Sequence, residues 1–336
     1  MIKLVLDCFG GDLSPDVNII GAVDSLNKLP DLTLILTGDK DIISQKLEGL
    51  IYDPERLIIE HAPEVVTCHE KPTEAIRRKD TSLYRAFELA RENDDISGLI
   101  SLGSTGAVLS GAVLRFGRIK GVLRPAFCPI MPTMNGGVVG ICDSGANAEC
   151  TPEYLQQFAI MGSRYIESVY GVNSARVALL NMGIEAEKGD PLHIAAHKLL
   201  VDTPSINFVG NMESRDVLSG KYDLVVCDGF SGNVLIKATE GACLEMLKML
   251  KREMTKSLKN KFGALFLKKS IMQQKEFMDY RNYSGGVMLG TRKIVVKCHG
   301  DGTAVTVRKC IEQAYMMASK NLVETIEREL QKITSE

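Results

Sequence analysis

The chain of 336 residues contains no tryptophan, and its aromatic residues make up only 6% of the total. It therefore has few of the side chains on which single-stranded nucleic acids stack. Its formal net charge of −2 gives no general attraction to nucleic acid either. The 9 cysteines include no C-x-x-C pair, which disfavours both a zinc ribbon and a disulfide framework. We expect a cytoplasmic protein with reduced cysteines and no nucleic-acid partner.

Long hydrophobic runs are also missing. The longest uncharged run, residues 96–114, contains four glycines and several hydroxyl side chains, whereas a membrane-spanning helix needs about 20 predominantly apolar residues. The first apolar run reaches Asp7 too soon for the apolar core of a signal peptide. We therefore expect neither a membrane span nor an export signal.

Several well-known catalytic and cofactor motifs are absent. The chain has no G-x-G-x-x-G, no G-x-S-x-G and no H-E-x-x-H. Gly285 and Gly290 have the spacing of a phosphate-binding loop, but the required lysine does not follow Gly290. His193 and His197 lie four residues apart without the accompanying glutamate, so we interpret them as part of a solvated helix face. The sequence gives no indication of a metal or of another cofactor.

What the chain does contain is an alternation of short apolar runs with longer helical patterns. Several runs are continuously apolar, as buried parallel strands are, so the pattern predicts a layered α/β fold with a mostly parallel sheet. We expect one catalytic unit over residues 1–336, which could divide into two subdomains around a shared cleft. Helices are predicted over 152–170, with Thr151 as its cap, 192–201 and 304–330, and a two-helix hairpin over 235–279. The expected strands are 2–6, 32–36, 57–59, 98–101, 138–142, 177–180, 206–209, 224–227 and 294–296.

Glycine-bearing polar loops follow seven of these runs. Turn chemistry alone explains one such loop, but seven at one edge of a sheet are more typical of a site where backbone N–H groups bind an anion. Lys188, Arg215 and His299 lie in or just after three of these loops and suit a phosphate. Cys8, Cys142, Cys227 and Cys298 also lie near strand ends, but we interpret them as buried packing residues. The loops comprise residues 7–12, 101–106, 143–147, 181–183, 210–211, 228–233 and 299–302.

At this point the residues resemble a known family. The opening Asp7-Cys8-Phe9-Gly10-Gly11-Asp12-Leu13-Ser14-Pro15 is similar to the D-A-M-G-G-D-x-A-P of the bacterial phosphate acyltransferases. Further similar segments follow in the family's order along the whole chain. They are Glu70-Lys71-Pro72 with Arg77-Arg78-Lys79, then residues 101–107, 143–147, 180–183, 210–216 and 227–233, and finally Lys297-Cys298-His299-Gly300.

The resemblance implies a reaction in which acyl-acyl carrier protein and inorganic phosphate give acyl-phosphate and free carrier. It also implies a homodimer with a fold like that of isocitrate and isopropylmalate dehydrogenases. The acyl-phosphate would supply a membrane glycerol-3-phosphate acyltransferase. We expect catalytic roles for His299, Lys188, Asn181 and Asp228. Phosphate or substrate binding is expected from Gly10, Gly11, Asp12, Gly103, Ser104, Thr105, Gly106, Arg215 and Asn233.

This chemistry fits the motifs that the chain lacks. Phosphate can attack a thioester itself, so no protein nucleophile is needed, and a thiolate whose pKa is about 8.5 leaves without a strong acid. The enzyme has to hold an anion near the carbonyl and stabilise the oxyanion.

The chain departs from the family at Ser104, where asparagine is usual, and at Asp301-Gly302, where two serines are usual. An acid at Asp301 would repel phosphate if it faced the site.

Three other functions stay open. The chain could be a phosphotransacetylase that uses coenzyme A, or a metal- and NAD-dependent hydroxyacid dehydrogenase. The dehydrogenase needs a helical pair of aspartates, whereas Asp223 and Asp228 lie on or beside one strand. The third alternative is a non-catalytic adaptor at the membrane surface, which would bind without turnover.

The predicted hairpin is strongly basic. Nine basic residues lie between Lys248 and Lys275, against the single acid Glu253, which gives this segment a charge of +8. An ordinary amphipathic pair packed on a dimer mate explains the helical spacing, but ordinary surfaces mix both signs of charge. We therefore expect peripheral binding to anionic membrane at the inner face of the plasma membrane, through a tip near Gly263. The membrane contacts would be Leu258, Phe262, Leu265, Phe266 and Leu267.

Overall fold

The strands form two sheets, where the sequence predicted one. The computed structural model describes residues 1–67, 70–278 and 285–334. The larger sheet has the strand order β3-β2-β1-β4-β12-β11-β5, and the smaller has the order β6-β7-β10-β8-β9. The expected α/β class and mostly parallel pairing are confirmed. The strands are β1 Ile2–Asp7, β2 Leu32–Gly38, β3 Leu57–His61, β4 Ile96–Ser101, β5 Ala126–Cys128, β6 Ile130–Pro132, β7 Val138–Cys142, β8 Arg176–Asn181, β9 Asn207–Glu213, β10 Leu224–Val226, β11 Gly286–Leu289 and β12 Ile294–Lys297.

Every strand expected from the sequence is present, but β5, β6 and β11 were missed. β5 and β6 are three residues long and β11 is four, which is too short to show a period of two. These strands also carry the antiparallel pairings, β11 with β12 and β5, and β6 with β7. Pro129 alone separates β5 from β6, so the chain passes from one sheet to the other at this residue.

The predicted helix over 152–170 is confirmed, with Pro152 in its first turn and Gly171 at its end in the left-handed conformation. Thr151 holds the N-cap position, but its hydroxyl bonds the Glu153 side chain instead of a backbone N–H. The helices are α1 Asp16–Lys28, α2 Lys40–Leu47, α3 Pro72–Ala75, α4 Ser82–Glu92, α5 Thr105–Gly111, α6 Pro152–Tyr170, α7 Pro191–Val201, α8 Gly229–Thr255, α9 Leu258–Met278, α10 Ala304–Ser319 and α11 Leu322–Thr334.

The helical pattern over 304–330 divides into two helices. α10 begins at a capping box formed by Thr303 and Thr306 and ends at Ser319, and Asn321 then adopts a φ of 48°. Asparagine tolerates this left-handed conformation better than most residues, so the chain turns there before α11. The apolar period continues across the turn, which is why the sequence did not reveal it.

One hydrophobic core joins the two sheets. Leu4 and Leu36 of the larger sheet and Leu179 and Val226 of the smaller belong to the same cluster of fully buried side chains. α6 contributes Phe158 to this cluster, and Phe158 is completely buried. The ends of both sheets are therefore held in fixed positions, which allows loops from the two sheets to build one site.

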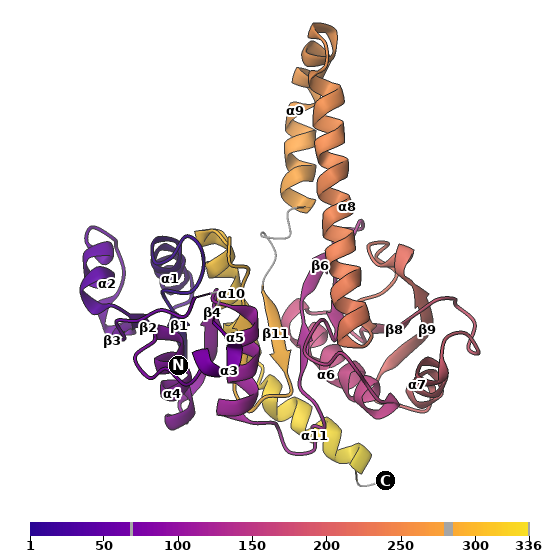
Figure 1. The fold of residues 1–336 in the computed structure, drawn as a ribbon, viewed down its shortest axis with the longest axis horizontal. Coiled ribbons are helices and arrows are strands. Elements are labelled where there is room, and N and C mark those ends of the chain that lie inside the picture. Colours follow the sequence, from indigo (N-terminus) through magenta and orange to yellow (C-terminus); the bar gives the residue numbers. More distant parts are fainter. Residues whose placement is uncertain (68–69, 279–284, 335–336) are drawn as a thin grey trace.

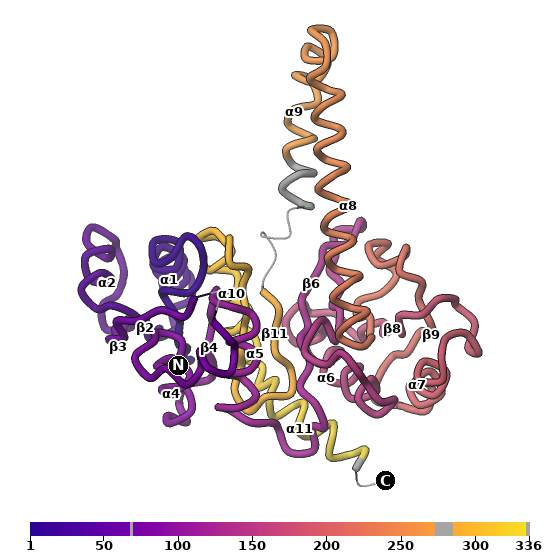
Figure 2. The backbone as a smooth tube through the Cα atoms, in the orientation of Figure 1, coloured from indigo at the N-terminus to yellow at the C-terminus, as the bar shows by residue number. Residues whose placement is uncertain are grey.

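α8 and α9 project from this body as a pair of helices that lie side by side (Figure 1). Figure 2 traces the chain up α8 and back down α9. The turn lies at Lys256 and Ser257, so the predicted tip near Gly263 is wrong. Ser257 Oγ accepts a hydrogen bond from the backbone N–H of Asn260 and so favours a turn there. Asp279, the last residue of the predicted segment, lies outside the described residues, as does the side chain of Lys275.

The five predicted membrane contacts lie on α9, and all of their side chains are exposed. Leu258 is 86% exposed and Phe266 is 78% exposed, and the rings of Phe262 and Phe266 pack edge to face. Leu265, Phe266 and Leu267 lie about two turns below the tip, since a helical turn takes 3.6 residues. No helix in the described part of the chain combines the length and the apolar character needed to cross a bilayer.

Candidate functional site

Loops that follow β1, β4 and β12 meet at the carboxyl edge of the larger sheet. The backbone N–H of Asp12 donates to Gly300 O at 2.7 Å. A Cβ atom on Gly10 would lie 2.5 Å from the backbone nitrogen of Gly103, so only glycine permits this approach. The structure therefore brings together three of the predicted glycine-bearing loops.

Asp7 holds the first of these loops to its neighbours. It is 1% exposed, and its two carboxylate oxygens accept hydrogen bonds from Ser82 Oγ at 2.6 Å and from Ser101 Oγ at 2.7 Å. Ser101 Oγ in turn accepts from the backbone N–H of Gly103 at 3.0 Å. Burial raises the pKa of Asp7 above its ordinary value, and the hydrogen bonds from the two serines oppose the shift. These contacts give Asp7 a structural role at the site.

Asp143 has the corresponding structural role in the smaller sheet. Its side chain is fully buried after β7, and its oxygens accept from the backbone N–H groups of Phe127, Ser144, Ala146 and Asn147. Burial raises the pKa of Asp143, and these hydrogen bonds act against the shift. The loop after β7 is thus fixed against the loop after β10, where Gly229 N donates to Asn147 O at 2.7 Å.

Asp228, predicted to be catalytic, caps a helix. It precedes α8, and its Oδ1 accepts from the backbone N–H of Ser231 at 2.8 Å, which satisfies one of the free donors at the helix start. Asp228 is 9% exposed and does not line the cavity described next. An aspartate between a strand and a helix is also the usual N-cap pattern. The sequence alone therefore allowed both a catalytic and a capping role for Asp228.

A cavity of about 360 Å³ lies between the loops of the two sheets. This volume falls in the range of small-molecule sites. Its polar lining includes three predicted site residues, Thr105, Asn233 and His299. Its apolar lining comes from the segment where the chain crosses between the sheets and from α5 and α8. The apolar lining consists of Leu109, Phe127, Pro129, Ile130, Met131 and Ile236.

Three charged residues that the sequence analysis did not place in the site also line this cavity. Lys297 is the last residue of β12 and only 6% exposed, and Lys237 and Glu240 lie on α8. Burial raises the pKa of Glu240, Lys237 opposes the shift, and Asp301 adds to it. Asp301 therefore interacts electrostatically with Glu240, although it does not itself line the cavity. Lys297 was visible in the Lys-Cys-His-Gly motif, but a lysine at a strand end is usually a surface charge.

The structure does not bring Asn181, Lys188 and Arg215 to this cavity. Asn181 Nδ2 donates to Lys188 O at 2.9 Å and so shapes its own loop after β8. Lys188 is exposed, and the exposed Arg215 forms an ion pair with Glu213. Asn181 ends β8, and Lys188 and Arg215 follow β8 and β9, the strands at the far side of the smaller sheet in Figure 1. The prediction that seven loops converge at one edge is therefore wrong, because the strands belong to two sheets.

The four strand-end cysteines are buried, as expected. Cys8, Cys142 and Cys227 are fully buried, and Cys298 is 1% exposed. Burial raises the pKa of all four thiols well above the ordinary value, so they are not thiolates at neutral pH.

His193 and His197 were predicted to lie on a solvated helix face, but both residues are half-buried. Their Nδ1 atoms lie 2.7 Å from Asp190 Oδ1 and 2.8 Å from Asn211 Oδ1, respectively.

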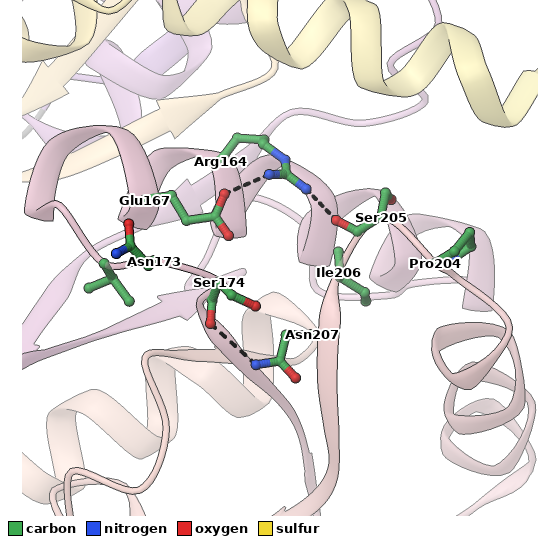
Figure 3. Close-up of a pocket in the computed structure, with 9 residues that line it drawn as sticks. Arg164, Glu167, Asn173, Ser174, Pro204, Ser205, Ile206 and Asn207 are labelled. Atoms are coloured by element: carbon green, nitrogen blue, oxygen red, sulfur yellow. Dashed lines mark hydrogen bonds and ion pairs between the residues drawn. The ribbon is translucent and has the colours of Figure 1, made fainter.

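A larger depression of about 650 Å³ lies at the opposite, amino end of β8 and β9 (Figure 3). Arg164 dominates it and bonds Glu167 at 2.6 Å and the backbone carbonyl of Ser205. Asn207 Nδ2 donates to Ser174 O at 3.2 Å. Arg164 Nε and Ser205 Oγ are buried here without a hydrogen-bond partner, and the depression contains none of the predicted site residues. Ligands of open α/β sheets bind at the carboxyl ends of strands, so the smaller cavity is the candidate site.

Comparison with known families and proteins gives matches over almost the whole chain. The family model described as "Fatty acid synthesis protein" matches residues 2–325. A phosphate acyltransferase of Clostridium acetobutylicum is 41% identical over 331 residues, which cover 98% of this chain and 99% of the relative. One of Clostridium tetani is 39% identical over 330 residues, which cover 98% of each chain.

A solved structure shares the fold. The crystal structure of a phosphotransacetylase from Streptococcus pyogenes matches with a TM-score of 0.65 and covers 95% of this chain and 94% of that one. The two sequences are only 15% identical, so the likeness establishes the fold and nothing about the substrate. The predicted likeness to isocitrate and isopropylmalate dehydrogenases stays a prediction.

Proposed function

This chain belongs to the fatty acid synthesis protein family, and from that premise we propose that it transfers a fatty acyl group from acyl carrier protein to inorganic phosphate. The observation that carries the proposal is the match to phosphate acyltransferases over 98% of the chain. The protein is thus an acyltransferase of lipid biosynthesis. Its product, an acyl-phosphate, is a substrate for a membrane glycerol-3-phosphate acyltransferase.

The cavity supports this reaction because both polar and apolar residues line it. Phosphate and the thioester carbonyl fit against Thr105, Asn233 and His299, which supply hydrogen-bonding groups. The first methylenes of the acyl chain fit against the apolar wall that includes Phe127 and Ile236. A phosphate oxygen attacks the carbonyl carbon, the carbonyl oxygen takes up negative charge, and the carbon–sulfur bond then breaks to release the carrier thiolate. Groups that bond this oxygen lower the barrier.

The proposed catalytic set is narrower than the one expected from the sequence. His299 and Asn233 stay in it as donors to phosphate or to the oxyanion, and Thr105 stays as a phosphate ligand. Gly103 lies in the loop before α5, the helix that begins at Thr105, and Gly106 lets this helix approach Pro72, while Gly10 and Gly11 allow the neighbouring loops to approach. Asn181, Lys188 and Arg215 do not enter this mechanism, because they lie outside the cavity.

The test is incubation of the protein with long-chain acyl-acyl carrier protein, with and without phosphate. We expect phosphate-dependent release of carrier thiol and formation of acyl-phosphate. Binding without turnover would support the adaptor instead, and turnover of acyl-coenzyme A in place of the carrier thioester would support the phosphotransacetylase. Reduction of NAD with malate-like acids would support the dehydrogenase. Full activity after treatment with EDTA is expected, since no residue in this mechanism binds a metal.

We also propose that the protein is a homodimer and binds peripherally to anionic membrane on the cytoplasmic side. The exposed Leu258, Phe262 and Phe266 support apolar insertion, and the basic residues of α8 and α9 support attraction to anionic lipid. With the turn at Lys256 and Ser257, Leu258 and Phe262 are the large apolar side chains of α9 that lie nearest to the tip. Sedimentation at about 37 kDa would contradict the dimer.

Co-sedimentation with vesicles of anionic lipid tests the membrane proposal. Leu258→Glu with Phe262→Glu should release the protein from the vesicles, and Leu265→Glu with Phe266→Glu should release it to a smaller extent. Ile51→Glu with Val201→Glu is the matched control, because Ile51 and Val201 are 87% and 61% exposed on the body of the molecule and the two replacements add the same charge. Wild-type protein that stays in solution with anionic vesicles at low salt would overturn the proposal.

A further inference from the structure

We propose that the side chain of Met131 limits the length of the acyl chain that the enzyme transfers efficiently. This inference rests on the proposed function and deepens it, because it names a residue that selects among acyl substrates. Met131 belongs to the short strand β6, which the sequence analysis missed, and it lines the cavity of about 360 Å³. It is 6% exposed, so it forms part of the inner wall of the cavity.

The apolar lining of the cavity includes a row of side chains on one extended segment. Phe127, Pro129 and Met131 are alternate residues of the chain that runs from β5 to β6, and all three line the cavity. Alternate residues of an extended chain lie about 6.6 Å apart, so the row covers about 13 Å. A row of this shape matches an alkyl chain, which is also extended and apolar.

The end of the row at Phe127 lies beside the proposed reaction centre. The backbone carbonyl of Phe127 accepts a hydrogen bond from the N–H of Ser144 at 2.9 Å, in the loop after β7. In the same loop, a Cβ atom on Gly145 would lie 3.2 Å from Asn233 Nδ2, so the loop lies against a side chain of the proposed catalytic set. A thioester carbonyl held by Asn233 therefore has Phe127 near it, and the acyl chain starts at this end of the row.

The end of the row at Met131 lies away from that loop. Met131 pairs with Val139 of β7, three residues before Cys142, at which the strand ends. It therefore lies about 10 Å from that end of the strand. Its side chain belongs to a cluster of buried residues that includes Ile236, which also lines the cavity. An acyl chain that follows the row meets the thioether of Met131, and a longer chain needs the space that this group fills.

The size of the side chain at position 131 should decide how many methylenes gain by burial. Each buried methylene strengthens binding by about fourfold, and binding energy of this kind raises kcat/KM. A methylene that meets a filled wall gains nothing, because closely packed interiors leave no room for it. A smaller residue at this position therefore extends the apolar site, and a larger one shortens it.

Met212 offers a matched control, because it is a methionine of the same buried cluster. It lies on β9, is fully buried and does not line the cavity. Met131→Ala and Met212→Ala remove the same atoms from one cluster, and only the first enlarges the cavity. Both variants should lower the Tm, so a change of substrate preference that occurs only in Met131→Ala does not come from lost packing.

The experiment measures kcat/KM at saturating phosphate for saturated acyl-acyl carrier proteins of medium and long chain, and compares the ratio of the long-chain to the medium-chain value. We expect Met131→Ala to raise this ratio about fourfold or more, since at least one further methylene is buried. Met131→Phe should lower the ratio by a similar factor, and Met212→Ala should keep it within about twofold of the wild type. Met131→Val should shift the ratio in the same direction as Met131→Ala and replaces it if that variant does not fold.

The failure of this proposal can be told from the failure of the proposed function. Turnover by the wild type with a ratio that stays unchanged in both the smaller and the larger Met131 variants would overturn the proposal alone. An equal shift in Met212→Ala would overturn it as well, because it would indicate a general loosening of the cluster. If the wild type turns over no carrier thioester, the proposed function fails. The same ratio of Kd values, measured without phosphate, then supports the proposal if it shifts in the Met131 variants and overturns it if it does not.

Discussion

The loops around the cavity and the α8–α9 pair use similar residues in opposite surroundings. Around the cavity, Lys297 is 6% exposed and Phe158 in the supporting core is fully buried. On the pair, the side chain of Lys248 is 71% exposed and Phe266 is 78% exposed. A charged side chain beside the cavity is fixed by hydrogen bonds and acts at short range. A charged side chain on the α8–α9 pair is solvated, and its longer-range field is screened by salt. Residue type alone therefore does not decide what a lysine or a phenylalanine contributes.

The largest expected difference between the two regions is in the free energy of unfolding. Asp143→Ala should lower the free energy of unfolding by about 3–5 kcal/mol, because it leaves several buried backbone N–H groups without their acceptor. Glu253→Ala on α8 removes an acid whose ion pairs among the described residues are with the exposed Arg252 and Lys256, and should change stability by at most about 0.5 kcal/mol. Urea denaturation of both variants measures the difference. Similar losses in the two variants would contradict the contrast.

The next effect is on catalysis. His299→Ala should lower kcat/KM about 100-fold, in the range reported for the loss of one group that stabilises an oxyanion. The half-buried His299 lies at a loop end, so the Tm should change little. Steady-state kinetics with the carrier substrate give the first value, and thermal unfolding gives the second. A variant that keeps more than half of the wild-type kcat/KM would remove His299 from the site.

A smaller effect concerns pH. Burial and the nearby Asp301 raise the pKa of Glu240, with Lys237 acting against the shift. The carboxyl group is neutral below that raised pKa and becomes negative as the pH rises through it, so it then repels phosphate more strongly. Glu240→Gln should therefore lower the phosphate KM, about threefold by a Coulomb estimate for partly solvated charges, and only on the alkaline side. A phosphate KM lowered equally at every pH would count against this explanation.

The smallest expected effect is on the Tm of variants in the α8–α9 pair. Phe266→Ala should leave the Tm of the protein within about 1 °C of the wild type, because an exposed ring loses little packing. Phe158→Ala in the body is the counterpart and should cost about 3–5 kcal/mol. The Tm of both variants should be measured at several protein concentrations. A concentration-dependent loss in Phe266→Ala would mean that a second copy of the chain covers this ring.

Much of the fold could be predicted because the strands of the body are buried runs. β2 is buried at every residue, and its continuous apolar sequence predicted a central parallel strand. The short β5, β6 and β11 could not be predicted, since three or four residues carry no period and their pairing partners are remote in sequence. The turn of the α8–α9 pair was placed near Gly263 on the strength of a glycine. In the structure that glycine lies within α9, and the turn occurs at Lys256 and Ser257.

The candidate site could be predicted only in part, again because the sequence does not show which remote segments pack together. The sequence identified Thr105, Asn233 and His299 as residues at strand ends, and the structure brings all three to one cavity. It gave equal weight to Lys188 and Arg215, which follow strands of the smaller sheet that lie away from the cavity. Lys297 was overlooked because its burial depends on the pairing of β12 with β4, which is remote in the sequence.

The sequence by itself determined the α/β class, most strands and the family, because local apolar periods and ordered motifs are properties of the chain alone. Only the tertiary structure decided that the strands divide between two sheets and which strand ends face one another. It also decided which lysine is buried, since burial depends on packing between segments far apart in sequence. The same hydrophobic effect that buries Leu4 leaves Leu258 exposed, because only the first finds apolar partners within the described chain.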